Sequence, residues 1–416
     1  MPNNWNTYNL FDFIDINPRM KFNSSEEYPF VEMKDLNPNS RKVLPSATKK
    51  LKGGAKFQNG DTLFARITPC LQNGKICQVK GLKNNKGFGS TEFLVFRGKE
   101  NISDNDFVYY LSREPFVRQF AESNMIGTSG RQRIAKEAFQ NLKLELPPLP
   151  EQKAIANILS VIDDKIENNL AINKTLEDMA MALYKHWFVD FGPFQDGEFV
   201  ESELGMIPKD WEVKRIKDFG DTVTGKTPSK KFPEHFGKEM AFVTPTDFKN
   251  YGKHILNANR SISILGIEKH KKNIIPVNSI IVTCIGSDMG KVAISKTSCL
   301  TNQQINSLKC KNYHFMYCFF VHNYSLLKRL AGDGTTMPII NKSSFENIEI
   351  LYPRKDILDD FEKKVMPFDE QILINTKENQ TLTELRDTLL PKLISGEVRL
   401  KEFREQVENV ITNEVK

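Results

Sequence analysis

The chain has 416 residues, which exceeds the length of a typical single domain and predicts two globular units joined by connectors. Lys and Arg number 58 against 52 Asp and Glu, so the net charge of +6 does not by itself identify a nucleic-acid partner. The six cysteines form no CxxC pair, and no histidine lies at zinc-ligand spacing from them, which argues against a zinc finger and a disulfide scaffold.

The beginning of the chain predicts no targeting segment. Residues 1–13, MPNNWNTYNLFDF, lack the basic start and the apolar stretch of a signal peptide. The most apolar stretch, residues 315–321, is far too short to span a bilayer. We therefore expect a cytoplasmic protein with no membrane partner.

The first part of the chain predicts an α+β fold followed by a long helix. Strand-like runs at residues 62–67 and 93–96 alternate with polar loops, and an apolar helix is predicted for residues 107–120. A helical run then extends from residue 151 to about 187. Its apolar side chains lie at three-four spacing: Ile155, Leu159, Ile162, Ile166, Leu176 and Leu183. Because a long helix with one apolar stripe needs a second helix to cover it, we expect a partner helix.

The rest of the chain repeats this organisation. A second globular part, residues 207–353, contains a strand-like run at 280–285 and a helix candidate at 313–330. A second helical run covers residues 357 to about 393, with Ile372, Leu382 and Leu389 among its expected packing residues. Trp5 and Asp163 recur as Trp211 and Asp369 at a separation of 206, and the separation drifts to 212 and 216 in the middle of the repeat.

Two homologous helical runs separated by a globular part are expected to pack antiparallel. The predicted fold is therefore two tandem globular α/β domains separated by two long helices in an antiparallel coiled coil, with pseudo-two-fold symmetry. Asn169 and Asn173, repeated as Asn375 and Asn379, interrupt the apolar stripe. They either fix the register of the helix pairing or are solvated interruptions, and the sequence favours neither.

One segment carries a specific family resemblance. Residues 146–152, LPPLPEQ, lead directly into the first long helix. The surrounding segment 127–169 resembles the junction between a target-recognition domain and the central helical region in specificity subunits of Type I restriction-modification systems. Residues 203–216 resemble the family's entry into a second recognition domain, and residues 388–400 resemble the end of its second helical region.

The resemblance covers nearly the whole chain, although the second copy departs from the PPLPEQ signature with Pro353-Arg354-Lys355. It implies recognition domain 1 at residues 1–150, a central helical spacer at 151–193, recognition domain 2 at 194–353, and a C-terminal helical region with a tail at 354–416.

The resemblance also implies a function. A specificity subunit is not an enzyme, and it would read an asymmetric two-part site in double-stranded DNA. Two methyltransferase subunits would dock on the helical regions, and restriction/translocase subunits would complete the complex. These partners would use S-adenosylmethionine, ATP and Mg, whereas this chain would bind no cofactor and no metal. The sequence has no NPPY or DPPY tetrapeptide, in agreement with methyl transfer by a partner.

Candidate DNA-facing residues lie in polar loops that differ between the repeats. Arg binds guanine bidentately, Gln suits adenine, and Lys and hydroxyl groups mostly hold phosphates. Taken singly, each candidate has a solvated surface role as its alternative. The candidates are Arg66, Lys75, Ser129, Arg131, Gln132 and Arg133 in the first half, and Lys226, Thr227, Ser229, Lys230, Lys231, Ser287, Lys291, Thr335 and Thr336 in the second.

Two other function classes stay open. Residues 220–227, GDTVTGKT, match the P-loop pattern of nucleotide-binding proteins, but Pro228 follows at once and disfavours the helix that a P-loop must open. The second alternative is a coiled-coil scaffold with no role in DNA binding. A specificity chain of a related multi-subunit system that cuts outside its site is a close variant of the favoured interpretation.

Overall fold

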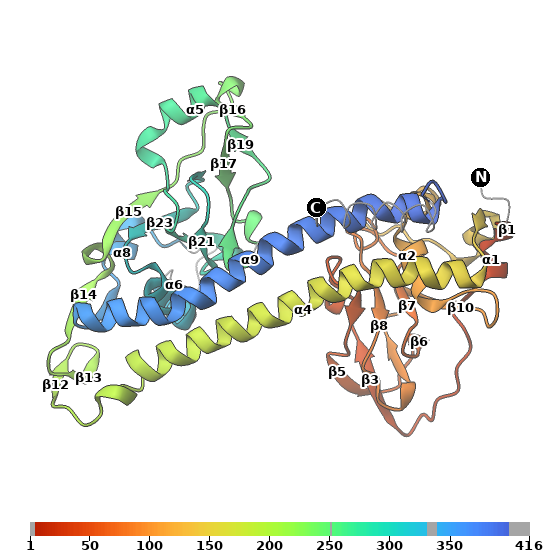
Figure 1. Cartoon of the computed structure of the whole chain (residues 1–416), viewed down its shortest axis with the longest axis horizontal. Helices are drawn as coiled ribbons and strands as arrows, with labels where there is room; N and C mark the ends of the chain where they lie inside the picture. Colours follow the sequence, from red (N-terminus) through yellow and green to blue (C-terminus); the bar gives the residue numbers. More distant parts are fainter. Residues whose placement is uncertain (1–4, 250–251, 331–338, 399–416) are drawn as a thin grey trace, which may run out of the picture. The chain divides into compact units, whose positions relative to one another are not determined.

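Figure 1 shows the computed structural model of the chain, which describes residues 5–249, 252–330 and 339–398. The chain divides into two compact units. The first unit runs to Asn169 and resumes at Glu378, and the second unit covers Leu170–Lys377. Each unit therefore contains one globular α/β part together with one half of each long helix. Among the described residues, no helix is long and apolar enough to cross a membrane.

The globular part of the first unit contains two mixed sheets, with strand orders β2-β10-β7-β8-β4 and β5-β3-β9-β6, and a separate antiparallel pair, β1 with β11. The strands are β1 (Asn6–Asn9), β2 (Ile14–Ile16), β3 (Glu27–Val31), β4 (Lys42–Val43), β5 (Ala47–Lys50), β6 (Ala55–Phe57), β7 (Thr62–Ala65), β8 (Ile76–Val79), β9 (Gly87–Gly89), β10 (Phe93–Gly98) and β11 (Lys143–Leu146). The helices are α1 (Leu10–Phe13), α2 (Asn105–Arg113) and α3 (Pro115–Ser123).

The second unit repeats this topology. Its five-stranded sheet has the order β15-β23-β20-β21-β18, with β18 parallel to β21 and the other pairs antiparallel, as in the first unit. Its strands are β12 (Phe199–Ser202), β13 (Gly205–Pro208), β14 (Glu212–Arg215), β15 (Gly220–Thr224), β16 (Phe236–Gly237), β17 (Met240–Val243), β18 (His254–Ile255), β19 (Ser261–Ile262), β20 (Ile280–Thr283), β21 (Val292–Ser295), β22 (Cys299–Thr301), β23 (Ile305–Cys310) and β24 (Glu349–Tyr352). Its shorter helices are α5 (Ile264–Lys269), α6 (Tyr313–His322), α7 (Tyr324–Leu330) and α8 (Lys342–Glu346).

The repeats differ in one sheet. Both four-stranded sheets contain three equivalent strands and one that differs. In the second unit the order is β16-β19-β17-β22, and the differing strand, β16, pairs with β19. In the first unit the differing strand, β6, pairs with β9. The strand β16 follows residues 225–235, which lengthen this repeat relative to the first. The common framework is therefore confirmed, and the divergence concentrates at a sheet edge.

Both predicted helices of the globular parts are broken in two. The run predicted at 107–120 ends at Arg113 and restarts at Pro115, because proline favours an extended residue before it and Glu114 adopts that conformation with ψ 132°. The run predicted at 313–330 divides into α6 and α7 at Asn323, whose side chain bonds back to the carbonyl of Phe319.

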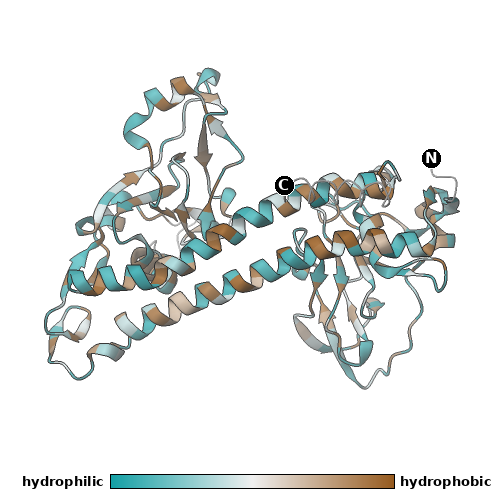
Figure 2. Cartoon of the chain, in the orientation of Figure 1, coloured by the Kyte–Doolittle hydropathy of each residue, from teal (hydrophilic) through white to brown (hydrophobic). Residues whose placement is uncertain are grey.

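The two long helices are α4 (Leu149–Phe188) and α9 (Lys355–Ile394). Figure 2 shows apolar and polar residues alternating along both. In the first unit, Ile155, Leu159, Ile162 and Ile166 are buried together with Leu389, and Leu382 packs against this core. In the second unit, Leu183 packs against the core, Ile372 is buried, and Leu176 is half-buried.

The four asparagines pair across the helices. Asn169 donates to the side-chain oxygen of Asn379 at 2.9 Å within the first unit, and Asn375 donates to that of Asn173 at 2.8 Å within the second. The residue numbers of the partners sum to 548 in both pairs, as 169 + 379 and 173 + 375, so the helices run antiparallel in a fixed register. Because Asn169, Asn173 and Asn375 are buried, Asn379 is partly buried, and the side chains are bonded in pairs, the structure favours the register role over a solvated interruption.

Candidate nucleic-acid interface

Each unit has a cleft at the same place in its fold. The parallel strands β3 and β9 in the first unit correspond to β17 and β22 in the second. In both units the loops after the carboxyl ends of these strands line the cleft. Glu32 and Ser90 line it in the first unit, and Thr244 and Asn302, each 212 residues later, line it in the second. The internal repeat therefore places two clefts at equivalent positions.

Two adjoining pockets, which share Gly54 and Thr91, make up the cleft of the first unit, and both are lined by cations. The basic residues are Arg19, Lys21, Lys49, Lys50, Lys52, Lys56 and Arg66. Arg19, Lys21, Lys50 and Lys52 are exposed and form no ion pair with the part of the chain that the structure describes. A row of unneutralised cations is the feature that attracts the phosphates of nucleic acid.

Two glycines bring the lysines to the edge of this cleft. Gly53 and Gly54 have φ of +125° and +97°, which L side chains rarely adopt. A Cβ on Gly54 would also lie 2.0 Å from the carbonyl oxygen of Gly89, so only glycine fits there. The chain can thus turn sharply between Lys52 and Lys56 while its backbone lies against β9.

The charge of the cleft also affects Glu32, an acidic residue that lines it. Lys34 and Lys49 lie 2.8 Å from the carboxylate of Glu32, and their hydrogen bonds lower the pKa of Glu32 to about 2. The ammonium of Lys49 also lies 4.0 Å from the ring centre of Phe30. The lysines therefore keep a positive local potential around an ionised carboxylate.

The DNA-facing residues predicted for the first half differ in their contacts: some line or lie beside the cleft, and others are bonded within the domain. Arg66 lines the cleft, and the segment 131–133 runs beside it, because Thr68 donates its amide to Gln132 and Ile134 donates its amide to Arg66. Ser129 and Arg131 are exposed. Arg133 forms an ion pair with Glu92 at 2.8 Å, and Lys75 donates to the carbonyl of Met33 at 2.7 Å, so both are held by the protein itself.

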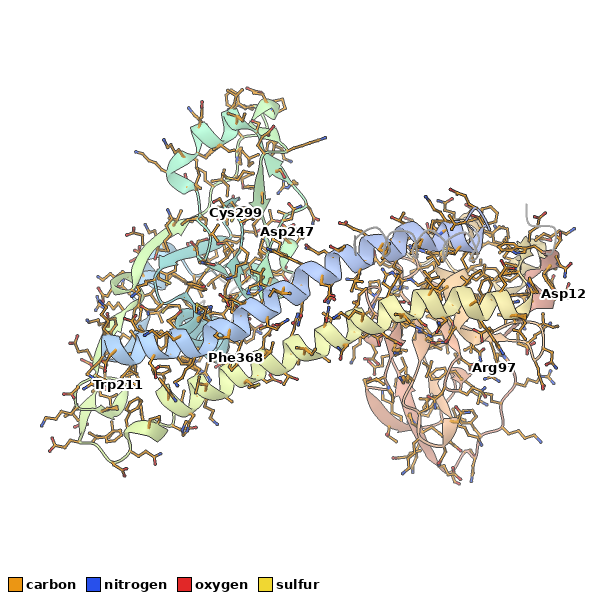
Figure 3. The ribbon with its side chains drawn as sticks, in the orientation of Figure 1. Asp12, Arg97, Trp211, Asp247, Cys299 and Phe368 are labelled. Carbon is orange, nitrogen blue, oxygen red and sulfur yellow. The ribbon has the colours of Figure 1, made fainter. Side chains whose placement is uncertain are left out.

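The cleft of the second unit has a different lining. Thr246, Arg260, Asp288, Asn302 and Gln304 surround it. The amide of Asn302 donates to the side-chain oxygen of Gln304 at 2.9 Å, which orients both side chains. Asp247, labelled in Figure 3, holds the turn beside the cleft by accepting the amide of Thr244 at 2.8 Å. Amides and one arginine suit hydrogen bonding to base edges more than neutralisation of phosphates.

The P-loop match is not a P-loop in the structure. Gly220–Thr224 forms strand β15, which pairs with β23. Gly225 and Lys226 continue extended, with their amides bonded to the carbonyls of Ile305 and Thr301. A phosphate-binding loop needs a helix whose first amides point at the phosphates, and this segment supplies none. The nucleotide-binding alternative therefore loses its structural basis.

The remaining predicted residues of the second half are exposed or bonded within the domain. Lys226 is exposed beside residues 301–303, and the hydroxyl of Thr227 donates to Gln303 at 2.6 Å. Ser229, Lys230 and Lys231 form an exposed turn. Lys291 forms an ion pair with Asp288.

For three predicted residues the structure does not describe the side chain. The backbone of Ser287 lies in a short turn of 3-10 helix, Gly286–Asp288, and its side chain lies outside the described residues. Thr335 and Thr336 lie outside the described residues altogether.

A local positive field extends around Lys226. Burial, followed by the charges of Lys226, His235 and Lys269, lowers the pKa of His270. The rings of His235 and His270 lie 6.2 Å apart, and Phe232 stacks on His235. Two lysines and two histidines therefore lie close together in this part of the second unit.

Sequence reasoning missed most of the cleft residues. Lys49, Lys50 and Lys52 precede a Gly-Gly pair, and that combination of a basic run with a turn signal is a usable sign. Arg260, Asn302 and Gln304 have no such sign, because only the pairing of β17 with β22 brings their loops together.

Two copies of one mixed-sheet domain, each with its own cleft and each packed on paired helices, define a tandem-domain protein with two related but unlike clefts. The family described as Type I restriction modification DNA specificity domain matches this chain twice, at residues 2–178 and 208–384. The chain belongs to this family.

Relatives and a solved structure agree with the assignment. The Type I restriction enzyme HindI specificity subunit of Haemophilus influenzae is 32% identical over 95% of this chain and 99% of its own length. The MjaIX specificity subunit of Methanocaldococcus jannaschii is 30% identical over 72% of this chain and 70% of its own. The crystal structure of a Type I S subunit from M. genitalium matches with a TM-score of 0.54 at 17% identity, covering 94% of this chain and 96% of that one, and shows the same fold.

Proposed function

We propose that this chain reads an asymmetric two-part site in double-stranded DNA and directs partner subunits to it. Each recognition domain would contact one half-site through its cleft. The chain would itself be non-catalytic, and partner subunits with S-adenosylmethionine, ATP and Mg would methylate adenine or restrict the DNA.

One observation carries this proposal: the two clefts occupy equivalent positions in the repeat but have unlike linings. Equivalent position supports a common ligand class, and the cationic lining of the first cleft supports nucleic acid as that class. The cationic first cleft and the Asn302–Gln304 pair in the second support two different half-sites.

The long helices support docking of partner subunits. Val161 and Leu385 in the first unit, and Met179 and Ile374 in the second, are large apolar side chains at least 45% exposed. A partner subunit docked on the helices would cover these apolar side chains. We assign the methyltransferase subunits to this surface because the family's specificity chains resemble this one along both helices.

Selection from a randomised duplex library tests the DNA proposal. The complex of this chain with its methyltransferase partner should enrich two short conserved blocks separated by a spacer of constant length and free sequence. Enrichment of one contiguous block, or of no sequence at all by a complex that is intact and active, would contradict it.

A further inference from the structure

Each long helix contains one buried aspartate that faces the recognition domain of its own unit. Asp163 on α4 and Asp369 on α9 are separated by the repeat distance of 206, and their side chains are 3% and 2% exposed. A carboxylate this deeply buried needs partners that compensate its charge. Those partners show what each aspartate holds together.

In the first unit, Asp163 joins the second long helix to the recognition domain. One carboxylate oxygen accepts from Arg386 of α9 at 2.8 Å, and the other accepts the hydroxyl of Tyr110 of α2 at 2.7 Å. The guanidinium of Arg41, beside β4, lies 5.5 Å from the ring centre of Tyr110. The next residue, Lys42, forms ion pairs with Asp164 and Glu167 on α4.

In the second unit, Asp369 joins α9 to three separate segments of the recognition domain. Lys253 and His254, at β18, approach one carboxylate oxygen at 2.8 and 2.7 Å. Lys296, after β21, approaches the other at 2.8 Å, and His314 of α6 lies 3.3 Å away. His314 also bonds Glu362 of α9 at 2.7 Å. Five buried or nearly buried side chains therefore meet at this point.

The two arrangements share one element, the edge strand of the five-stranded sheet. The basic pair Arg41-Lys42 and the pair Lys253-His254 are separated by 212, the distance that relates the two clefts. Both pairs lie at the edge strand of the five-stranded sheet, β4 or β18, which is parallel to its neighbour. The chemistry differs, since arginine dominates in the first unit and lysine with histidine in the second. The attachment point is retained although its residues have changed.

We propose that Asp163 and Asp369 are positioning residues for DNA reading, each fixing the recognition domain of its own unit on the helix pair so that its cleft meets its half-site. This inference rests on the proposed function. Buried ion pairs and hydrogen bonds orient a domain more strictly than apolar contacts do. If the recognition domain rotates on the helices, the buried charges lose their partners.

The test uses the full complex with the methyltransferase partner. Asp163→Asn and Asp369→Asn are nearly isosteric, and genome-wide mapping of N6-methyladenine reports on both half-sites at once. We expect each variant to relax the base preference of one half of the motif, a different half for each variant, while the other half stays as in the unmodified chain. Two unchanged motifs, or relaxation of the same half by both variants, would overturn the inference.

Matched controls and a second measurement separate positioning from loss of folding. Asp178→Asn on α4 and Asp360→Asn on α9 change exposed carboxylates, at 62% and 55%, and should leave the motif unchanged. Hydrogen exchange of Asp369→Asn should quicken in β18 and β21 and stay as before in β4 and β8. Unchanged protection of β18 and β21 would also overturn the inference. Failure of the unmodified complex to give any two-part motif would instead remove the proposed function.

Discussion

At the scale of single residues, the repeat keeps structural contacts and changes the binding surface. Asp35 accepts the amide of Glu32 at 2.6 Å, and Asp247, 212 residues later, accepts the amide of Thr244 at 2.8 Å. The same turn is therefore held in the same way in both units. The side chains that line the clefts differ instead, from lysines in one to amides in the other. This contrast separates the residues that build the domain from those that line its cleft.

Lys50 and Lys52 provide a direct test of the first cleft. If both hold phosphates, Lys50→Ala with Lys52→Ala should weaken DNA binding and reduce the slope of log K against log salt by up to about 2, since each phosphate contact contributes about 0.9. Fluorescence anisotropy over a salt series measures both quantities. Lys209→Ala, which removes an exposed lysine outside the clefts, is the control. An unchanged slope in the double variant would remove this loop from the interface.

The two histidines beside Asp369 predict opposite pH dependence. Burial acts to lower the pKa of His314, but its contacts with Asp369 and Glu362 outweigh burial and the pKa is raised. For His254, burial outweighs the contact with Asp369, and the pKa is lowered. The charged and titratable groups around them are Lys253, Lys296, Glu362, Asp369, Glu177, Tyr313 and Tyr317.

Linkage gives the sign of each effect. The raised pKa of His314 contributes stability that is fully present below about pH 6.5, the ordinary histidine value, and is lost as the pH rises through the folded-state pKa. The lowered pKa of His254 contributes stability present above that value and lost as the pH falls. In urea unfolding, the stability difference for His314→Gln should therefore shrink from pH 6 to pH 8.5, and that for His254→Gln should grow. His186→Gln replaces an exposed histidine and controls for the substitution of histidine by glutamine. Parallel profiles for both variants would contradict this assignment.

Residue-scale prediction from the sequence was partial for a physical reason. Arg66 lines the cleft, and Lys75 and Arg133 have polar partners within the domain, while DNA contact by these residues stays a prediction. Whether a basic side chain faces DNA or a carbonyl depends on neighbours that are distant in sequence, such as Met33 for Lys75. Composition and loop position do not carry that information.

At the scale of elements, the long helices were the most predictable part of the fold. A run expected from 151 to about 187 is a helix over Leu149–Phe188, and one expected from 357 to about 393 covers Lys355–Ile394. Their periodicity is local, so the sequence shows it directly. Strand order was beyond the sequence because pairing is not local: β2 pairs with β10, about 80 residues later in the chain.

We expect the buried asparagine pairs to fix the register of the two long helices at some cost in the free energy of unfolding. Asn375→Leu should destabilise the chain by about 1–3 kcal/mol, because the buried side chain of Asn173 loses its partner. Replacing both residues with Leu should recover stability, since an apolar pair suits the interface. Urea unfolding midpoints measure both effects.

Asn157→Leu, an exposed position on α4, is the control for the substitution. A double variant less stable than the single one would contradict the register interpretation and point to an independent role for each asparagine.

At the scale of the whole molecule, duplication accounts for the architecture better than any single motif. The offset of 206 recovered from the sequence relates Asp163 to Asp369, and the offset of 212 relates the turns and clefts of the two units. A local pattern such as GDTVTGKT misleads because its first five residues, Gly220–Thr224, form strand β15 in this fold and pair with β23. The repeat predicted the domain plan, and the structure was needed to locate the surfaces.

We propose that this chain selects the DNA site at which a partner methylates adenine. Genome-wide mapping of N6-methyladenine, in cells that produce the methyltransferase partner with and without this chain, is the decisive measurement. We predict one asymmetric two-part motif that is methylated only when the chain is present. A stable, active complex whose methylation shows no motif dependent on this chain would contradict the account.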